Sequence, residues 1–273
     1  MFLFYVAAKK HSPELNHRWG KIEIFIYGSV NPDCETPSHF PFKVIARIRS
    51  DFPDKFGIPR QSGLLKELRS SIRFEPEFRV ADALRGLEGF SHLWVLWIFS
   101  ENVRVGENGE NRWSPTVRPP RLGGNKRLGV FATRSSFRPN PVAMSCVKIE
   151  EIRLNVVDGD YCGPEIIVSG ADMMDGTPIV DIKPYLPYAD SVPDALGGFA
   201  EPLREKSLKV EFSVDLGEFP AEKLDTLREI LAEDPRPAYQ KDADRVYGFK
   251  FAGFEVKFKV QDEVLSVLDL IKI

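Results

Sequence analysis

The chain has 273 residues, of which 43% are hydrophobic and 11% aromatic, so it can bury one large core or two modest ones. This composition excludes an intrinsically disordered chain, and a formal net charge of −3 excludes a surface that is basic over its whole extent. Any nucleic-acid contact must therefore come from a local concentration of basic residues.

Features of membrane, secreted and metal-binding proteins are missing from the sequence. No run of about 18 apolar residues occurs, and the positive charges of the opening MFLFYVAAKK follow its apolar stretch, the reverse of a secretory signal. Cys34, Cys146 and Cys162 form no C-x-x-C pair, and the four histidines form no H-E-x-x-H motif. We therefore expect a cytoplasmic protein that has no membrane partner, no metal and no disulfide framework.

The first part of the chain predicts short strands. Residues 1–41 are interpreted as an N-terminal extension and linker, with a strand at 21–30 followed by turn-forming residues. At 42–49 (FKVIARIR) apolar and basic residues alternate, as in a half-buried strand, and 80–87 predicts a short helical turn. Further strands are predicted at 92–99, 128–133, 142–153 and 165–171. Short strands between Pro, Gly and Asn loops predict a mainly β domain over 42–198, either a closed barrel or a sandwich.

The sequence pattern changes after a predicted domain boundary at 190–198. Apolar residues at helical spacing predict a helix over 220–233. Strands are predicted at 208–214, 247–251 and 254–260. Residues 205–273 therefore form a small α+β unit near the lower size limit for independent stability, and we expect it to pack on the barrel.

The sharpest local feature is a basic, acid-free ribbon between residues 112 and 148. It contains eight basic residues and no Asp or Glu: Arg112, Arg118, Arg121, Lys126, Arg127, Arg134, Arg138 and Lys148. Arginine suits bidentate recognition of phosphate or carboxylate, and the prolines and glycines of the ribbon restrict its backbone in advance of binding. The ribbon therefore predicts an anion-binding surface, with a solvated basic loop as the alternative.

Two other segments offer candidate chemistry. Residues 172–187 (DMMDGTPIVDIKPYLP) place four candidate catalytic side chains in a proline-rich stretch after a strand: Asp175, Asp181, Lys183 and Tyr185. The alternative is an Asp-Gly turn with Asp181 and Lys183 as a surface pair. Residues 57–63 (GIPRQSG) form a polar loop that carries little signal alone, and Trp94 and Trp97 are expected to lie in the core.

Several long strings, in this order, resemble one family. They are IARIRS, DKFGIPRQSGL, ADALRGLEGFSHLWVLWIF, WSPTVRPPRLGGNKRLGVFATRSSFRPNPVAMS and DGTPIVDIKPYLPYADS. The chain resembles the TsaA-like (TrmO, formerly YaeB) family of tRNA N6-adenosine methyltransferases from about residue 42 to about 193. The later DPRPAY and YGFKFAGFEVKF resemble the C-terminal domain of bacterial members. The sequence has no G-x-G-x-x-G motif after a predicted strand, which argues against a Rossmann-type methyltransferase and is consistent with this resemblance.

The resemblance implies a six-stranded barrel-like core with a small C-terminal α+β domain, and S-adenosylmethionine as methyl donor. It implies a homodimer with the active site near the subunit interface. The implied substrate is N6-threonylcarbamoyladenosine at position 37, beside the anticodon of a threonine tRNA, and the product carries a methyl group on N6. Within that reaction Asp175, Asp181 and Tyr185 are candidate bases for the N6 proton, and Lys183 could hold the threonyl carboxylate.

The resemblance also carries site residues onto this chain. The implied cofactor-binding residues are Gln61, Ser62, Gly63, Ser100, Glu101, Arg134, Met144, Ser169, Gly170, Ala171 and Asp172. The candidate tRNA contacts are Arg118, Arg121, Lys126, Arg127 and Arg138. Ser100 departs from a His that several members carry, Ser114 stands where relatives often have Arg, and the loop at 102–111 is longer here.

These departures leave room for two other functions. The first is a non-catalytic tRNA-binding module of the same fold, which would bind tRNA without transferring a methyl group. The second is a small-molecule enzyme that binds an acidic metabolite through Arg134 and Arg138.

Overall fold

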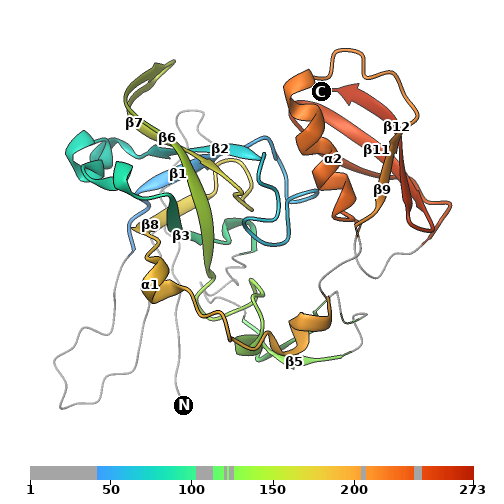
Figure 1. Ribbon diagram of the computed structural model, residues 1–273, viewed down its shortest axis with the longest axis horizontal. Helices are drawn as coiled ribbons and strands as arrows, with labels where there is room; N and C mark the ends of the chain where they lie inside the picture. The colour runs from blue at the N-terminus through green and yellow to red at the C-terminus, as the bar shows by residue number, and fades with distance from the viewer. Residues whose placement is uncertain (1–41, 103–112, 120–121, 123–125, 204–206, 237–241) are drawn as a thin grey trace, which may run out of the picture.

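The computed structural model describes residues 42–102, 113–119, 122, 126–203, 207–236 and 242–273. The extension predicted at 1–41, with its strand, lies outside these residues, and so do Arg112 and Arg121. Two parts stand next to each other in Figure 1: a barrel coloured blue to yellow, and a C-terminal unit coloured orange to red.

The first part is a closed barrel of antiparallel strands in the order β1-β2-β7-β6-β3-β8. The strands are β1 (Ala46–Arg49), β2 (Arg69–Phe74), β3 (His92–Ile98), β6 (Val142–Asp158), β7 (Tyr161–Ser169) and β8 (Pro178–Pro184). Their inward side chains, such as Ile48, Ile72, Val95 and Ile166, form one buried cluster. The predicted mainly β fold with a six-stranded barrel is confirmed.

Buried and half-exposed side chains alternate along most of β3. Leu93, Val95 and Trp97 are buried, whereas Trp94 and Leu96 lie on the half-exposed outer side. The expectation that Trp97 lies in the core is confirmed, whereas that for Trp94 is wrong, because a barrel strand has only one face toward the core. The outer face still packs aromatics, since the ring centroids of Trp94 and Tyr185 lie 5.7 Å apart.

Several predicted elements differ from the observed ones. The strand expected at 128–133 is reduced to β5 (Leu128–Gly129), which pairs with β4 (Thr116–Val117), and a 3-10 turn follows over Val130–Ala132. Both β2 and β8 were missed, because their polar residues face outward and Pro178 and Pro184 suggested a loop. The remaining short elements are α1 (Pro187–Asp190) and 3-10 turns at Pro76–Phe78, Ala81–Leu84, Leu87–Gly89, Ser100–Asn102 and Gly198–Leu203.

The C-terminal unit is a four-stranded sheet, in the order β10-β11-β12-β9, with one helix against it. Its elements are β9 (Lys209–Phe212), a 3-10 turn (Ala221–Lys223), α2 (Leu224–Ala232), β10 (Tyr247–Phe251), β11 (Phe254–Gln261) and β12 (Val264–Lys272). The apolar residues Leu227, Ile230 and Leu231 of α2 are buried, as their helical spacing predicts. The strand β12 was not predicted. Within the described ranges, no helix is long and apolar enough to cross a bilayer.

The two parts share a hydrophobic core through the chain that joins β1 to β2. Phe52, Leu65 and Leu68 of this connection are buried in the same cluster as Phe251 and Leu227 of the C-terminal unit. The ring centroids of Phe52 and Phe251 lie 5.2 Å apart. The connection is therefore folded against the C-terminal unit at both of its ends.

The buried ring of Phe52 is expected to matter for stability much more than its exposed neighbour. Phe52→Ala should lower the free energy of unfolding by about 3–5 kcal/mol, because it leaves a cavity between the two parts. Phe56 lies in the same connection but is 55% exposed, so Phe56→Ala should change that free energy by less than about 0.5 kcal/mol. Denaturant unfolding monitored by circular dichroism measures both, and equal losses would contradict the shared core.

Candidate functional site

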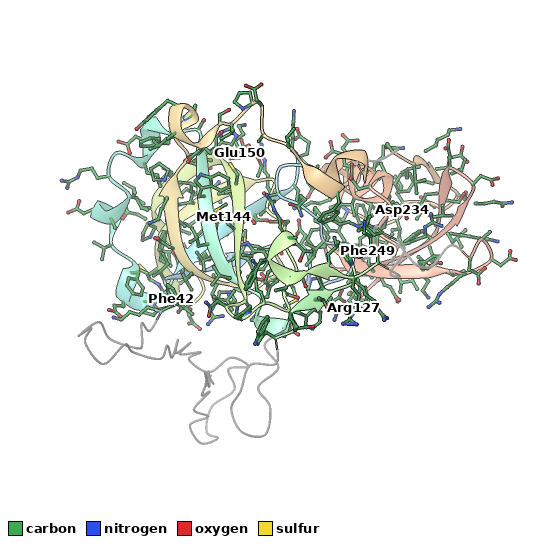
Figure 2. All side chains as sticks on the ribbon, turned by 90° about the horizontal axis from the view of Figure 1, so that it is seen from below. Phe42, Arg127, Met144, Glu150, Asp234 and Phe249 are labelled. Carbon is green, nitrogen blue, oxygen red and sulfur yellow. The ribbon has the colours of Figure 1, made fainter. Side chains whose placement is uncertain are left out.

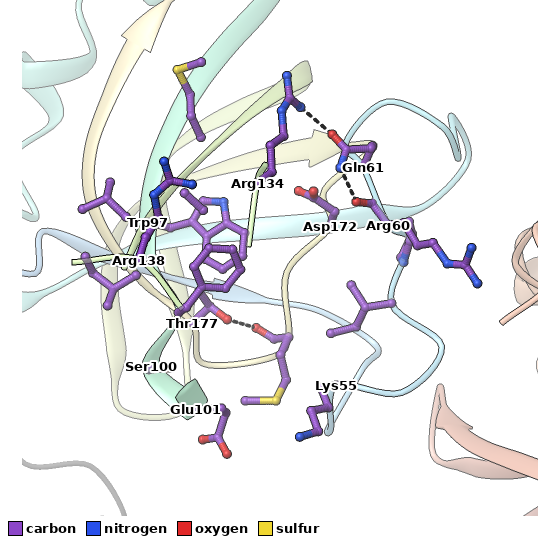
Figure 3. A pocket seen from close by; sticks show the side chains of 18 of the residues that line it. Lys55, Arg60, Gln61, Trp97, Ser100, Glu101, Arg134, Arg138, Asp172 and Thr177 are labelled. Atoms are coloured by element: carbon purple, nitrogen blue, oxygen red, sulfur yellow. Dashed lines mark hydrogen bonds between the residues drawn. The ribbon is translucent and has the colours of Figure 1, made fainter. Parts of the chain in front are cut away.

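A cavity of about 520 Å³ opens at the end of the barrel where β3 ends and β6 begins. Figure 3 shows that the charged side chains around it come from separate loops. The lining residues are Lys55, Ile58–Gln61, Trp97–Glu101, Thr133, Arg134, Arg138, Val142–Met144, Asp172, Met174 and Thr177. A cavity of this size, apolar with a few convergent polar groups, is typical of a small-molecule site.

Asp172 follows β7 and is the carboxylate that the barrel itself fixes in the cavity. Its Oδ1 accepts a hydrogen bond from Ser145 Oγ at 2.5 Å, and Ser145 Oγ in turn accepts one from Trp97 Nε1 at 2.9 Å. Burial raises the pKa of Asp172 above its ordinary value, although the Ser145 hydroxyl and the charge of Arg134 oppose the shift. The cavity therefore holds an oriented carboxylate with increased proton affinity.

Arg134 lies beside Asp172 and is held by a chain of hydrogen bonds (Figure 3). Arg134 Nη1 donates to Gln61 Oε1, and Gln61 Nε2 donates to the backbone oxygen of Arg60 at 2.7 Å. Arg138 also lines the cavity, and its Nη1 donates to the backbone oxygen of Thr133 at 3.1 Å. The cavity is thus lined by two guanidinium groups and by the carboxylates of Asp172 and Glu101. This arrangement suits a ligand that carries a positive and a negative charge.

Five of the implied cofactor residues stand behind the cavity rather than in its lining. They are Ser62, Gly63, Ser169, Gly170 and Ala171. Gly63 N donates to the oxygen of Gly170 at 2.8 Å, and a Cβ on Gly170, whose φ is +79°, would lie 3.1 Å from the Gly63 backbone. Ser62 Oγ accepts a hydrogen bond from Cys146 N at 3.1 Å. These residues bind the 60–63 loop tightly to the barrel wall.

The structure does not bring the four predicted catalytic residues into the cavity. Asp175 accepts a hydrogen bond from Ser50 N at 3.1 Å, and Asp181 forms a 2.6 Å ion pair with Lys183 on the outer side of β8. Tyr185 packs on Trp94, also outside the barrel. The geometry matches the alternative of an Asp-Gly turn and a surface pair, and a catalytic role for these residues stays a prediction.

A second, larger cleft of about 1650 Å³ lies between the barrel and the C-terminal unit. It adjoins the cavity, because both are lined by Lys55, Ile58–Gln61, Thr133 and Arg134. Its basic residues are Lys55, Arg60, Arg118, Arg127, Arg134 and Arg236, against the acidic Glu233 and Asp234. Figure 2 shows Arg127 at the boundary between the two parts.

The predicted tRNA contacts are therefore distributed over three locations. Arg118 and Arg127 line the cleft, whereas Arg138 lines the cavity. Lys126 is exposed and lines neither, and Arg121 lies outside the described residues. Lys55 and Arg60 were missed as site residues, although both lie in the matched string DKFGIPRQSGL.

Comparison with known proteins identifies the family. The sequence model of the tRNA-methyltransferase O N-terminal domain matches residues 47–191, and that of the TrmO C-terminal domain matches residues 205–273. The chain belongs to the TrmO family. The resemblance inferred from the sequence strings is confirmed.

Two bacterial relatives match this TrmO family chain over nearly their whole length. The tRNA (adenine(37)-N6)-methyltransferase of Escherichia coli K12 is 41% identical, over 85% of this chain and 98% of that protein. A putative S-adenosylmethionine-dependent methyltransferase, RcsF, of Pseudomonas aeruginosa is 40% identical over 83% of this chain and 95% of that protein. The crystal structure of TrmO from P. aeruginosa superimposes with a TM-score of 0.64 at 33% identity, covering 89% of this chain and all of that one.

The raised pKa of Asp172 predicts how stability depends on pH. The folded chain holds this proton more tightly than the unfolded chain, so the ionised carboxylate destabilises the fold, and the loss grows as pH rises through the folded pKa. Asp172→Asn keeps an oxygen for Ser145 but removes the charge. The variant should therefore melt at a higher temperature than the wild type at neutral pH.

That difference should shrink as pH falls toward the ordinary pKa of an aspartate, about 3.9, because both chains are then uncharged at residue 172. Thermal denaturation from about pH 4 to about pH 8 measures the trend. A wild-type chain that melts no lower than Asp172→Asn at neutral pH would contradict the burial argument.

Proposed function

We propose that this TrmO family chain is an S-adenosylmethionine-dependent tRNA adenine(37)-N6-methyltransferase, with its donor site in the cavity around Arg134 and Asp172. One observation carries the proposal: a cavity lined by both positive and negative side chains opens beside a cleft whose charged side chains are mostly basic. The names of the relatives from E. coli and P. aeruginosa, a tRNA (adenine(37)-N6)-methyltransferase and an S-adenosylmethionine-dependent methyltransferase, support the same reaction.

The cavity residues fit the proposed methyl donor. S-adenosylmethionine carries a carboxylate, an ammonium group, a sulfonium and an adenosine. Arg134 and Arg138 offer guanidinium groups for the carboxylate, and Glu101 at the rim offers a partner for the ammonium. The apolar walls at Ile58, Met144, Phe99 and Met174 suit the adenine ring. When bound, this cofactor supplies a methyl group that passes from sulfur to N6.

The cleft is proposed to take the anticodon loop of tRNA. Arg118 and Arg127 stand exposed in its lining and supply phosphate contacts, which give affinity rather than sequence selectivity. We propose N6-threonylcarbamoyladenosine in a threonine tRNA as the methylated nucleoside. Lys55 and Arg60, where cleft and cavity adjoin, offer cations for its threonyl carboxylate.

The residues of the cavity must also take up the proton that N6 loses when the new carbon–nitrogen bond forms. Asp172 is our candidate acceptor, because its pKa is raised and the Trp97–Ser145 hydrogen bonds fix its orientation. The ureido carbonyl of the substrate makes the N6 proton more acidic, so a carboxylate suffices. Holding donor and acceptor in one cavity contributes about 7–11 kcal/mol by proximity.

We propose further that the chain acts as a cytoplasmic homodimer with the active site near the subunit interface. Apolar side chains at the mouth of the site support this part of the proposal. Met144 is 54% exposed and lines the cavity, and Phe131 is 73% exposed and lines the cleft. A second copy of the chain would cover both.

Transfer of a labelled methyl group from S-adenosylmethionine to tRNA tests the proposal. The substrates are threonine tRNA that carries the threonylcarbamoyl group and the same tRNA without it. We expect label only in the modified tRNA, because the unmodified N6 amine is less acidic. Tight tRNA binding without transfer would favour the non-catalytic module, and equal labelling of both tRNAs would contradict the proposed nucleoside.

Variants in the same assay locate the proton acceptor. In single turnover, Asp172→Asn should slow methylation by about 100-fold or more, the range of a lost general base. Asp175→Asn and Asp181→Asn are matched controls outside the cavity, and each should keep the rate within about threefold. A slow Asp181→Asn beside a fast Asp172→Asn would return the base to β8.

A further inference from the structure

The loop that forms one wall of the cavity is pressed against the C-terminal unit at Gly57. Gly57 has a φ of +81°, and a Cβ built on it would lie 2.2 Å from Cδ2 of Phe249. Phe249 is buried in β10. No side chain larger than hydrogen fits between this backbone and that ring, so the loop and the C-terminal sheet are in direct van der Waals contact.

Arg60 connects the same wall to the end of α2. Its Nη2 donates to the backbone oxygens of Asp234 and Arg236, each at 3.0 Å. The Arg236 guanidinium holds this acceptor turn in place, with its Nε 2.8 Å from Asp234 Oδ1. Since Gln61 donates to the oxygen of Arg60 and accepts from Arg134, hydrogen bonds run from the end of α2 into the cavity.

The C-terminal unit also fixes the start of this connection. Asp51 forms a 2.5 Å ion pair with Lys223, and its backbone oxygen accepts a hydrogen bond from Ala252 N at 3.1 Å. The neighbouring Phe52 belongs to the shared core. The segment from Asp51 to Gln61 is therefore attached to the C-terminal unit at its beginning, middle and end.

We propose that the C-terminal unit sets the affinity for the methyl donor by holding the Lys55–Gln61 wall of the cavity, with Gly57 and Arg60 as positioning residues. This inference rests on the proposed donor site. If the wall is already ordered before the ligand binds, less conformational entropy is lost on binding. Loosening the contact at Gly57 raises the dissociation constant of the donor even though Gly57 does not line the cavity.

Gly57 separates positioning from direct contact, because Gly57 and Phe249 are absent from the lining of the cavity. Gly57→Ala in the full chain should raise the Kd for S-adenosylmethionine, measured by calorimetry without tRNA, by about tenfold. Gly86→Ala is the matched control: its φ is +89°, and a Cβ there meets nothing within 4 Å. It carries the same left-handed strain and should leave Kd within about twofold of the wild type.

A second readout distinguishes a displaced wall from general damage. Gly57 lines the cleft, so the assay uses saturating tRNA as well as saturating donor. Gly57→Ala should then methylate tRNA in single turnover at nearly the wild-type rate, because the reacting groups are unchanged. Arg60→Lys, which keeps a charged donor nitrogen for the two carbonyls, should raise Kd less than Arg60→Ala. A folded Gly57→Ala with an unchanged Kd would overturn the proposal.

Lys223→Ala tests the same coupling if Gly57→Ala does not fold. It removes the ion pair with Asp51 without adding an atom, and we expect a rise in Kd of about threefold. Lys272→Ala, which breaks a pair with Glu218 inside the C-terminal unit, should leave Kd unchanged. Equal Kd values for both lysine variants would contradict the coupling. A wild-type chain that fails to bind the donor would instead contradict the proposed function.

Discussion

The packing of residues 51–68 against the C-terminal unit is the constraint on which the site depends. This connection leaves β1 and returns to β2, and in between the barrel holds it through hydrogen bonds of short segments such as Ser62 and Gly63. Phe52 and Leu65 enter the core of the C-terminal unit, and Gly57 touches Phe249. The exposed side of the same loop then forms a wall of both the cavity and the cleft. The shape of the site therefore depends on how the second unit packs against this connection.

The charged side chains next to that wall lower the stability of the fold and favour binding of a charged ligand. Asp172 is half-buried at the end of β7, where removal from water disfavours its charged form. Arg134 and Arg138 come from a ribbon whose sequence contains no acid, so their charges are not neutralised within it. A ligand that carries both a carboxylate and a cation offsets these costs. A destabilised, charged cavity of this kind is typical of functional sites.

The sequence pattern predicts the barrel strands in which apolar and polar residues alternate or apolar residues dominate. It does not predict the strands that form only because the barrel closes. The polar segment RSSIRF becomes β2, and the segment with two prolines becomes β8, because a closed sheet needs a partner at each edge. Asp181, Lys183 and Tyr185 were expected in one site, but alternate residues of a strand share a face, and this face is the outer one. Arg60 lies in the polar loop GIPRQSG, but that pattern does not reveal its role, since its partner Asp234 lies far along the chain. The cavity residues Gln61, Arg134 and Asp172 came from family resemblance rather than from periodicity.

Hydrogen–deuterium exchange with and without S-adenosylmethionine tests most directly where the donor binds. The account predicts slower exchange at 58–63, 133–144 and 172–174, and also at 234–236, which hydrogen-bond Arg60 without lining the cavity. Protection confined to 181–185 on the outer face of β8, with no change at 58–63, would contradict it.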